Sequence, residues 1–245
     1  GDGSYWLGTS GGLVHFFPSV DRFDVIRPVA GEVGGMPGRV VTSVLRRPDG
    51  KLWVGFGQEW DPKLRHTRRT EDGAFTAAGL AMYDPATNAW SYQVHASLSG
   101  EPSSLKTVPS ENITDLALDS VGNLWVGTKR YEVWQHYCPE GGSSDCVDAW
   151  VPAGGGVAVT DLDSVATSGG TVESAKWSAY RQESSSGGSV ASSQCYSDSI
   201  SMLRADVEGR MWVATLDRGL LLFRKGIAQR ESCTSLPRYT TVVRS

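Results

Sequence analysis

One stretch decides the fold of this chain: DSVGNLWVGT at residues 119–128. It opens with a turn signal, because Asp forms local hydrogen bonds and Gly accepts the positive φ that tight turns need. An apolar run of high β propensity follows. Three other stretches align with it on a Trp, namely YWLGT at 5–9, LWVGF at 52–56 and MWVAT at 211–215. Four tryptophans and three turn glycines therefore mark a structural repeat: Trp6, Trp53, Trp125, Trp212, Gly50, Gly122 and Gly209.

Each aligned Trp lies in a group of short β segments. In three units an upstream segment carries a β-branched residue twelve positions before the Trp, at Val41, Ile113 and Ile200. A segment opened by Gly follows the Trp in every unit. A fourth segment follows in three units, at Phe23–Ile26, Trp90–Tyr92 and Trp177–Tyr180. Each unit therefore consists of four β segments, A to D, joined by turns.

This repeat predicts a β-propeller. Trp6 and Trp53 lie 47 positions apart, which is the period of a propeller blade, and insertions lengthen the later units. One four-stranded sheet cannot bury both its faces, so successive sheets stack face to face. We predict an all-β fold, with residues 1–245 forming one propeller region and blades at about 1–29, 39–94, 111–181 and 199–245. A β-sandwich is the alternative.

The repeat resembles that of a known family. The pattern Asp-x-x-Gly-x-Leu-Trp-Val-Gly-Thr, then Gly-Leu and an aromatic residue, is similar to the two-component regulator propeller repeat, with Phe56 and Ala214 as departures. The resemblance implies a propeller that is usually seven-bladed and often forms the extracytoplasmic sensing part of a hybrid histidine kinase. Four units are fewer than seven, so the chain looks like part of a larger protein or a divergent relative. An open arc of four blades would expose apolar faces at both ends, so we expect more blades before Gly1 or after Ser245, or a dimer partner.

The segment Arg238–Ser245 has two interpretations. As strand D of the fourth blade it would follow Phe223 through a Pro-containing loop, and we favour this interpretation. As strand A of the first blade it would close a ring, because Thr240 and Val242 would then take the places of Thr42 and Val44.

Composition excludes several classes of function. The 245 residues carry a formal charge of −4, with 40% hydrophobic and 20% charged residues, which is typical of a globular domain. The mild acidic balance argues against a nucleic-acid partner. No apolar stretch reaches the roughly 18 residues that a membrane-spanning helix needs, so no membrane insertion is expected.

Two long insertions lie between segments B and C of the second and third units, which predicts that they project from one face of the propeller. Loops gathered at one end of a rigid scaffold commonly build binding sites. Their cations suit carboxylate or sulfate groups and their aromatic rings suit sugars, so an acidic glycan or another acidic ligand is the hypothesis. A solvated loop balanced by Asp61, Glu71 and Asp72 is the alternative. The candidate ligand-binding residues are Trp60, Lys63, Arg65, His66, Arg68, Arg69, Lys129, Arg130, Tyr131, Trp134 and Arg218.

The cysteines bear on the cellular compartment of the protein rather than on a catalytic or metal-binding function. Cys138 and Cys146 bracket a short loop and are candidates for a disulfide, which would indicate a periplasmic or secreted protein. The pairing of Cys195 and Cys233 stays open. No Cys or His cluster has the spacing of a zinc site, so neither a metal nor a cofactor is expected. Asn112-Ile113-Thr114 fits a glycosylation sequon but falls at a predicted strand start, so we interpret it as chance.

Three functions follow from the sequence. The first is a non-enzymatic sensing propeller that binds a small molecule or a glycan. The second is a protein-interaction scaffold of a secreted or surface protein. The third is an enzyme similar to streptogramin lyase, for which His136 is the one residue we would test first; the sequence names no catalytic residue.

Overall fold

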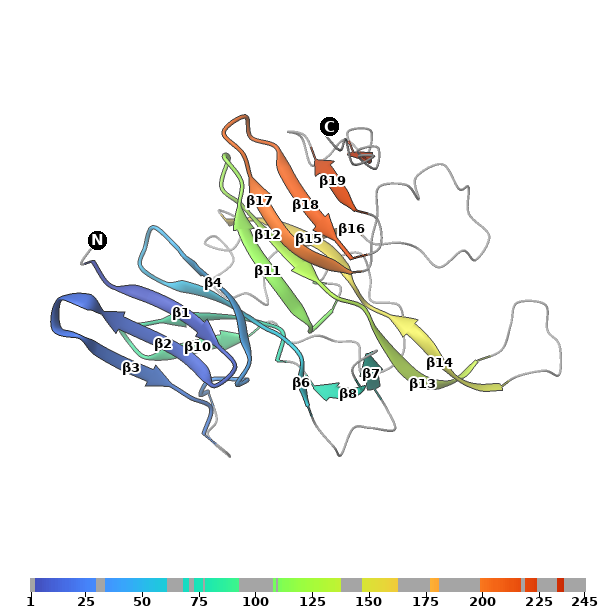
Figure 1. Ribbon diagram of the computed structural model, residues 1–245, viewed down its shortest axis with the longest axis horizontal. Coiled ribbons are helices and arrows are strands. Elements are labelled where there is room, and N and C mark those ends of the chain that lie inside the picture. The colour runs from blue at the N-terminus through green and yellow to red at the C-terminus, as the bar shows by residue number, and fades with distance from the viewer. Residues whose placement is uncertain are drawn as a thin grey trace, which may run out of the picture.

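The computed structural model describes residues 3–29, 34–60, 68–70, 73–76, 78–92, 108, 110–137, 147–162, 177–180, 199–216, 219–223 and 233–235. Nearly all regular structure in these ranges is antiparallel β-sheet, which confirms the predicted all-β propeller. The sheets follow one another along a curved stack, with the first and the fourth at its two ends (Figure 1).

Four of the sheets correspond to the repeated units, and in each of them the strands pair in chain order. Sheet 1 contains β1 (Tyr5–Thr9), β2 (Gly12–Phe17) and β3 (Arg22–Ile26). Sheet 2 contains β4 (Val41–Arg46), β5 (Leu52–Phe56), β9 (Leu80–Asp84) and β10 (Ala89–Tyr92). Sheet 3 contains β11 (Ile113–Leu118), β12 (Asn123–Thr128), β15 (Gly156–Asp161) and β16 (Trp177–Tyr180). Sheet 4 contains β17 (Ile200–Ala205), β18 (Met211–Thr215), β19 (Leu220–Phe223) and β20 (Cys233–Ser235).

The outer strand of sheet 4 differs from the strand we favoured. Cys233–Ser235 pairs with β19, with Thr234 opposite Leu222. The segment Arg238–Ser245 is more β-prone, but it lies outside the described residues.

The hydrophobic core lies between the sheets. In sheet 2 one face carries Trp53, Gly55, Leu80 and Met82, and we call this side of each sheet its Trp face. The other side, here Leu52, Val54 and Ala81, is the receiving face. Three apolar clusters fill the spaces between sheets 1 and 2, 2 and 3, and 3 and 4, and each joins one Trp face to the next receiving face. Burying apolar area in this way supplies most of the stabilisation of a stacked repeat.

Close packing between sheets explains the glycine that lies two positions after the Trp in three of the repeats. A Cβ on Gly8 would lie 2.8 Å from Val41 Cγ1, one on Gly55 2.6 Å from Ile113 Cγ2, and one on Gly127 2.7 Å from Ile200 Cγ2. The residues that meet these glycines are the β-branched residues twelve positions before each Trp. Strand A of each blade therefore rests directly on the backbone of the preceding strand B, and a methyl group would hold it away.

Polar bonds also join the first strands of neighbouring sheets. The Thr42 hydroxyl donates to Ile113 O at 2.9 Å, and Leu116 N donates to Ser43 Oγ at 3.1 Å. One step further along the stack, Asp115 Oδ2 accepts from Leu203 N and from the Arg204 guanidinium, each at 2.8 Å. The β-bulges in these first strands produce the register shift beside these bonded residues.

The turn between segments A and B contains an Asp that holds the Trp. Asp119 Oδ1 accepts from Val121 N and Asn123 N, and its Oδ2 accepts from the Trp125 indole at 2.9 Å. Asp206 repeats the arrangement, with the Trp212 indole at 2.8 Å. Desolvation acts to raise the pKa of Asp206, but hydrogen bonds from Arg210, Trp212 and Glu208 outweigh it and hold the pKa far below its ordinary value.

Sheet 2 lacks this carboxylate. Arg47 occupies the place of Asp119, and its backbone makes the same turn, with Arg47 N donating to Lys51 O and Gly50 N donating to Arg47 O. The Arg47 guanidinium lies over the Trp53 ring at 5.8 Å and pairs with Asp49 at 3.2 Å. The buried Trp53 Nε1 has no hydrogen-bond partner as a result.

Gly55→Ala is expected to destabilise the protein by about 1–3 kcal/mol, because overpacking a closed interior costs that much and Ile113 is fully buried. Chemical denaturation measures the change. Gly11→Ala is the matched control, because its Cβ would meet nothing closer than Thr9 Oγ1 at 3.8 Å. Equal losses in the two variants would contradict the packing argument.

Arg47→Asp is expected to stabilise the protein by about 1 kcal/mol, since it supplies an acceptor for the buried Trp53 Nε1. Asp49 would then lie two positions after the new carboxylate. Sheet 4 already tolerates this spacing, because Glu208 lies two positions after Asp206. Arg46→Asp makes the same charge change at an exposed neighbouring position. Thermal and urea unfolding of both variants give the comparison, and an Arg47→Asp protein no more stable than Arg46→Asp would refute the expectation.

Candidate functional site

The two long insertions come together in one additional sheet. Its strand order is β14 (Val147–Ala153), β13 (Tyr131–Tyr137), β7 (Arg68–Thr70), β8 (Gly73–Thr76) and β6 (Glu59–Trp60). The last three strands come from sheet 2 and the first two from sheet 3. The joining ladder places Glu132 opposite Arg69 and Val133 opposite Arg68. We call this structure the inserted sheet; Figure 1 shows it beyond the ends of the blade strands.

Backbone bonds fix the inserted sheet to the propeller at its base. Lys129 N donates to Asn112 O at 2.9 Å, and Lys129 forms a β-bridge with Ser199 of the fourth blade. On the other side, the Arg39 guanidinium pairs with the Glu59 carboxylate at 3.0 Å. Asn112 is buried, 3% exposed, which agrees with our interpretation of its sequon as chance. The inserted sheet therefore starts from ordered positions in three successive blades.

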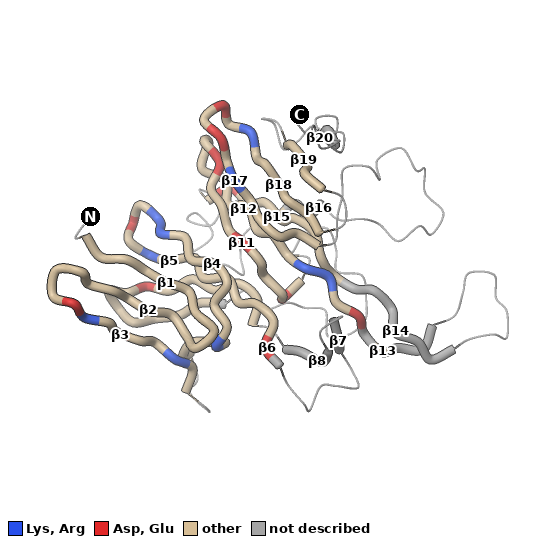
Figure 2. Tube along the Cα trace, in the orientation of Figure 1, with Lys and Arg blue, Asp and Glu red and all other residues tan. Residues whose placement is uncertain are grey.

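The structure places four of the predicted cations on, or directly before, two strands that pair with each other. Lys129 and Arg130 directly precede β13, and Arg68 and Arg69 lie in β7, the neighbouring strand. Acidic residues share the region, as Glu132 lies opposite Arg69 and Glu59 lies in the edge strand β6. Figure 2 shows the basic stretch at the passage from β12 to β13, followed by an acidic position. Lys63, Arg65, His66 and Arg218 lie outside the described residues.

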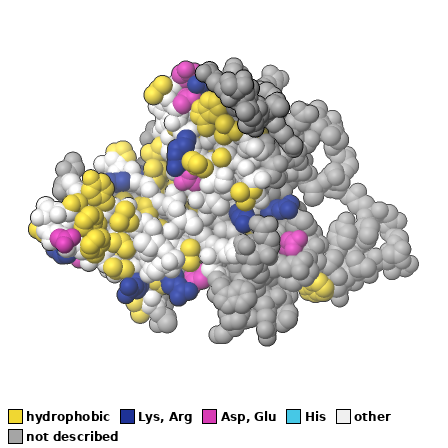
Figure 3. All heavy atoms as spheres, viewed as in Figure 1, with side chains coloured by type: hydrophobic (Ala, Val, Ile, Leu, Met, Phe, Trp, Pro, Cys, Tyr) yellow, Lys and Arg dark blue, Asp and Glu magenta, His cyan; other side chains and the backbone are white. Residues whose placement is uncertain are grey.

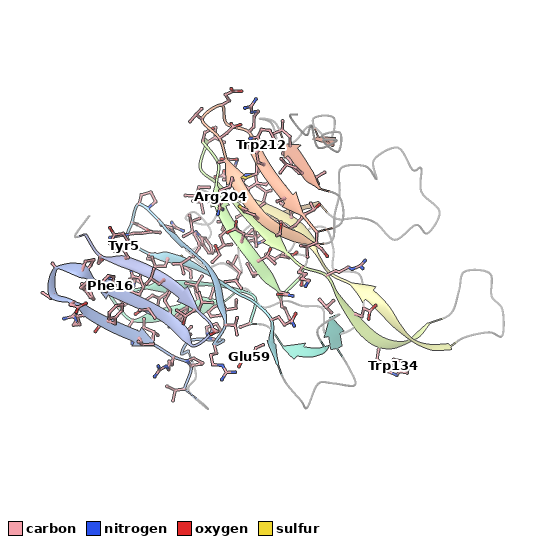
Figure 4. All side chains as sticks on the ribbon, in the orientation of Figure 1. Tyr5, Phe16, Glu59, Trp134, Arg204 and Trp212 are labelled. Carbon is pink, nitrogen blue, oxygen red and sulfur yellow. The ribbon has the colours of Figure 1, made fainter. Side chains whose placement is uncertain are left out.

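The aromatic candidates Tyr131 and Trp134 differ in how much of the side chain is exposed to solvent. Tyr131 is 2% exposed, so its ring belongs to the interior and offers no surface for stacking. Trp134 is 47% exposed and projects away from the blades (Figure 4). Trp60 lies in β6, at the far edge of the inserted sheet from β13.

Sequence reasoning missed one neighbour of the site. Trp150 lies directly opposite Trp134 in the β13–β14 hairpin, and His136 lies opposite Asp148. A signal was present in the sequence, because Trp134 and Trp150 lie at equal distances from Cys138 and Cys146. A hairpin centred between the cysteines pairs the two tryptophans automatically.

The described part of the chain contains no metal-binding cluster. Across these ranges, no three His, Cys, Asp or Glu residues are grouped so as to hold a metal ion. His15 stacks on Trp6 with ring centroids 3.9 Å apart, and its Nε2 lies 2.7 Å from Ser4 Oγ. Among the same residues, no helix has the length and apolar character to cross a membrane.

Comparison with known proteins identifies the repeat. The family model described as Two component regulator propeller matches residues 107–130, which include β11 and β12. The third blade carries a two-component regulator propeller repeat. This confirms the resemblance predicted from Asp119–Thr128. No curated protein sequence matches the chain.

Solved structures with detectable similarity include three bacterial surface or extracellular proteins. PorZ, a surface component of the type-IX secretion system of Porphyromonas gingivalis, is 16% identical over 89% of this chain and 23% of its own, with a TM-score of 0.47. The extracellular domains of the two-component system BT3049 and the one-component system BT4673 of B. thetaiotaomicron are 13% and 19% identical over 91% and 90% of this chain, with TM-scores of 0.25 and 0.24. The chain spans 32% of each of these two domains.

Proposed function

We propose that this chain is a non-enzymatic, ligand-binding part of a sensing propeller and that the inserted sheet is its ligand-binding surface. One observation carries the proposal: insertions from two different blades pair with each other between β7 and β13. Two unrelated surface loops would have no reason to share a ladder. The pairing instead gives each insertion a fixed position, and a fixed position is what a binding site on a rigid scaffold needs.

The side chains favour an acidic ligand, such as a glycan with carboxylate or sulfate groups. Arginine presents planar, bidentate donors that match these groups, and the joined strands place Arg68 and Arg69 beside the strand that follows Arg130. The exposed Trp134 supplies an apolar ring that would stack on a sugar. Sensing, rather than simple storage, is supported by the two-component regulator repeat at residues 107–130.

An extracytoplasmic location is the second part of this proposal. In the β13–β14 hairpin, Tyr137 lies opposite Val147. Cys138 and Cys146 are the next residues along the chain beyond this pair, one after β13 and one before β14, and both lie outside the described ranges. We propose a disulfide between these two cysteines, and such a disulfide would indicate an oxidising compartment outside the cytoplasm.

The hairpin disulfide predicts a simple mass-spectrometric result. Protein purified from an oxidising compartment is expected to give a peptide in which Cys138 is linked to Cys146, and reduction is expected to add two hydrogens to it. Cys195 and Cys233 serve as internal comparison, since neither is predicted to pair with these two. A free thiol at Cys138 in such material would contradict the assignment.

Replacing Arg68, Arg69 and Arg130 together with Ala is expected to weaken binding of acidic oligosaccharides by more than about tenfold, because hydrogen bonds to charged groups contribute about 1.5–3 kcal/mol each. A glycan array followed by calorimetry at two salt concentrations measures the loss. The matched control replaces Arg22, Arg27 and Arg46, three exposed arginines on other strands and loops, with the same change in charge. Equal binding by both triple variants, or no binding of acidic glycans by the unaltered protein, would refute the acidic-ligand proposal.

A protein-interaction role is the second candidate. It is favoured by apolar side chains on sheet 1 that are exposed and lie outside the inserted sheet, namely Tyr5, Leu7, Phe23 and Val25.

A further inference from the structure

The two faces of the inserted sheet differ in their exposure to solvent. Neighbouring residues of a strand lie on opposite faces of a sheet, and residues directly opposite each other on paired strands lie on the same face. At the start of β13, Tyr131 is buried, whereas Arg130 and Trp134 are exposed and Glu132 is half-buried. We call the side of Glu132 and Trp134 the Trp134 face and the side of Tyr131 the Tyr131 face. The Trp134 face is therefore the one that a ligand can reach.

Strand β14 adds a second tryptophan to the Trp134 face. Trp150 is the residue directly opposite Trp134 in the ladder, so the two positions are adjacent on that face. Asp148 lies opposite His136, one row further along the hairpin, and these two positions share the face as well. The Trp134 face thus carries a cross-strand pair of tryptophans with polar residues in the next row.

Strand β7 divides the predicted arginines between the two faces. Arg69 lies opposite Glu132 and belongs to the Trp134 face, whereas Arg68 lies opposite Val133 and belongs to the Tyr131 face. The register therefore places a carboxylate directly across from Arg69. Opposite charges at such positions stabilise each other, so Arg69 and Glu132 compensate each other next to the tryptophan pair.

The uncompensated positive charge of the Trp134 face lies at the base of the hairpin. Arg130 directly precedes β13, is exposed, and has no ion pair in the part of the chain that the structure describes. Figure 3 shows basic, acidic and apolar side chains following one another outward over the start of β13. An acidic group therefore fits the base, and an uncharged ring with hydroxyl groups fits the tryptophan pair and the polar rows beside it.

The spacing of these two features sets a minimum length for the ligand. Arg130 and Trp134 are 134 − 130 = 4 residues apart, which corresponds to about 14 Å in an extended strand. A single sugar ring cannot cover that span, so it could reach the cation or the tryptophans but not both. A chain of several sugars can reach both.

We propose that the Trp134 face binds an acidic oligosaccharide, with uncharged sugar rings on the Trp134–Trp150 pair and an acidic group at Arg130. This inference rests on the proposed function and narrows it, because it selects one face of the inserted sheet and excludes a monosaccharide or a small acid as the full ligand. A cross-strand tryptophan pair also stabilises a hairpin. The experiment therefore has to separate ligand stacking from hairpin stability.

A series of fragments of increasing length tests the proposal. The probes are single sugars and size-fractionated oligosaccharides of hyaluronan, alginate or polygalacturonate, whichever binds best on the glycan array. Calorimetry with the unaltered protein is expected to show an affinity gain of at least about tenfold from the single acidic sugar to the long fragments, since only these reach the tryptophans. An affinity that does not depend on fragment length would overturn the inference while leaving an acidic ligand in place.

Two substitutions of one residue separate stacking from hairpin stability. Trp134→Val removes the ring but keeps a β-prone residue, and it is expected to abolish the gain with length. Trp134→Phe keeps a ring and is expected to retain most of the gain. Arg130→Ala is expected to weaken binding of every fragment by a similar factor, with Arg46→Ala at an exposed position elsewhere as the matched control. A gain with length that survives in Trp134→Val would overturn the inference.

Oxidative footprinting of the unaltered protein gives a measurement that depends on no variant. Hydroxyl radicals oxidise exposed tryptophans, and mass spectrometry locates the oxidised residue. A long fragment is expected to protect Trp134 and Trp150, and the single acidic sugar is expected to leave both unprotected. Binding of the long fragment without protection of these residues would overturn the inference alone. Absence of binding by any acidic glycan would instead overturn the proposed function together with it.

Discussion

The structure depends on one close contact between successive blades. A β-branched side chain at the start of each first strand rests on a glycine in the preceding Trp-bearing strand, as Ile113 does on Gly55. Because no Cβ intervenes, the two sheets approach closely enough for Trp53, Leu80 and Leu124 to share one apolar cluster. Without that approach the Trp would have no opposing apolar surface. Each sheet would then expose both of its faces to solvent and would not be stable by itself.

Polar groups also stabilise the stacked blades, both at the turn before the Trp-bearing strand and between neighbouring sheets. The Asp119 carboxylate accepts a hydrogen bond from the indole N–H of Trp125 and at the same time holds the turn that precedes the strand of this Trp. Asp115 performs the corresponding task between sheets, because it bonds to Ser43 on one side and to Leu203 on the other. The scaffold is therefore restrained both within and between blades, and it can support insertions that have few contacts of their own.

The inserted sheet uses this support. It begins at Lys129, which bonds to Asn112 and bridges to Ser199, so three chain segments fix one end of β13. From there β13 reaches β7, and the two insertions stabilise each other through a shared ladder. The apolar face of sheet 1 is independent of this site, since it lies at the end of the stack and follows from the repeat rather than from the insertions.

The sequence by itself determined the repeat, its turns and the blade strands other than β20, because their signals are local: Asp119, Gly122 and Trp125 act within ten residues of one another. It also predicted that the two insertions share a face, since strand alternation decides this. Tertiary structure alone decided the rest. The placement of Arg69 opposite Glu132 in the ladder and the burial of Tyr131 against the exposure of Trp134 each depend on residues far apart in the chain. Propensity and spacing carry no information about such contacts, because the partners meet only after the sheets have stacked.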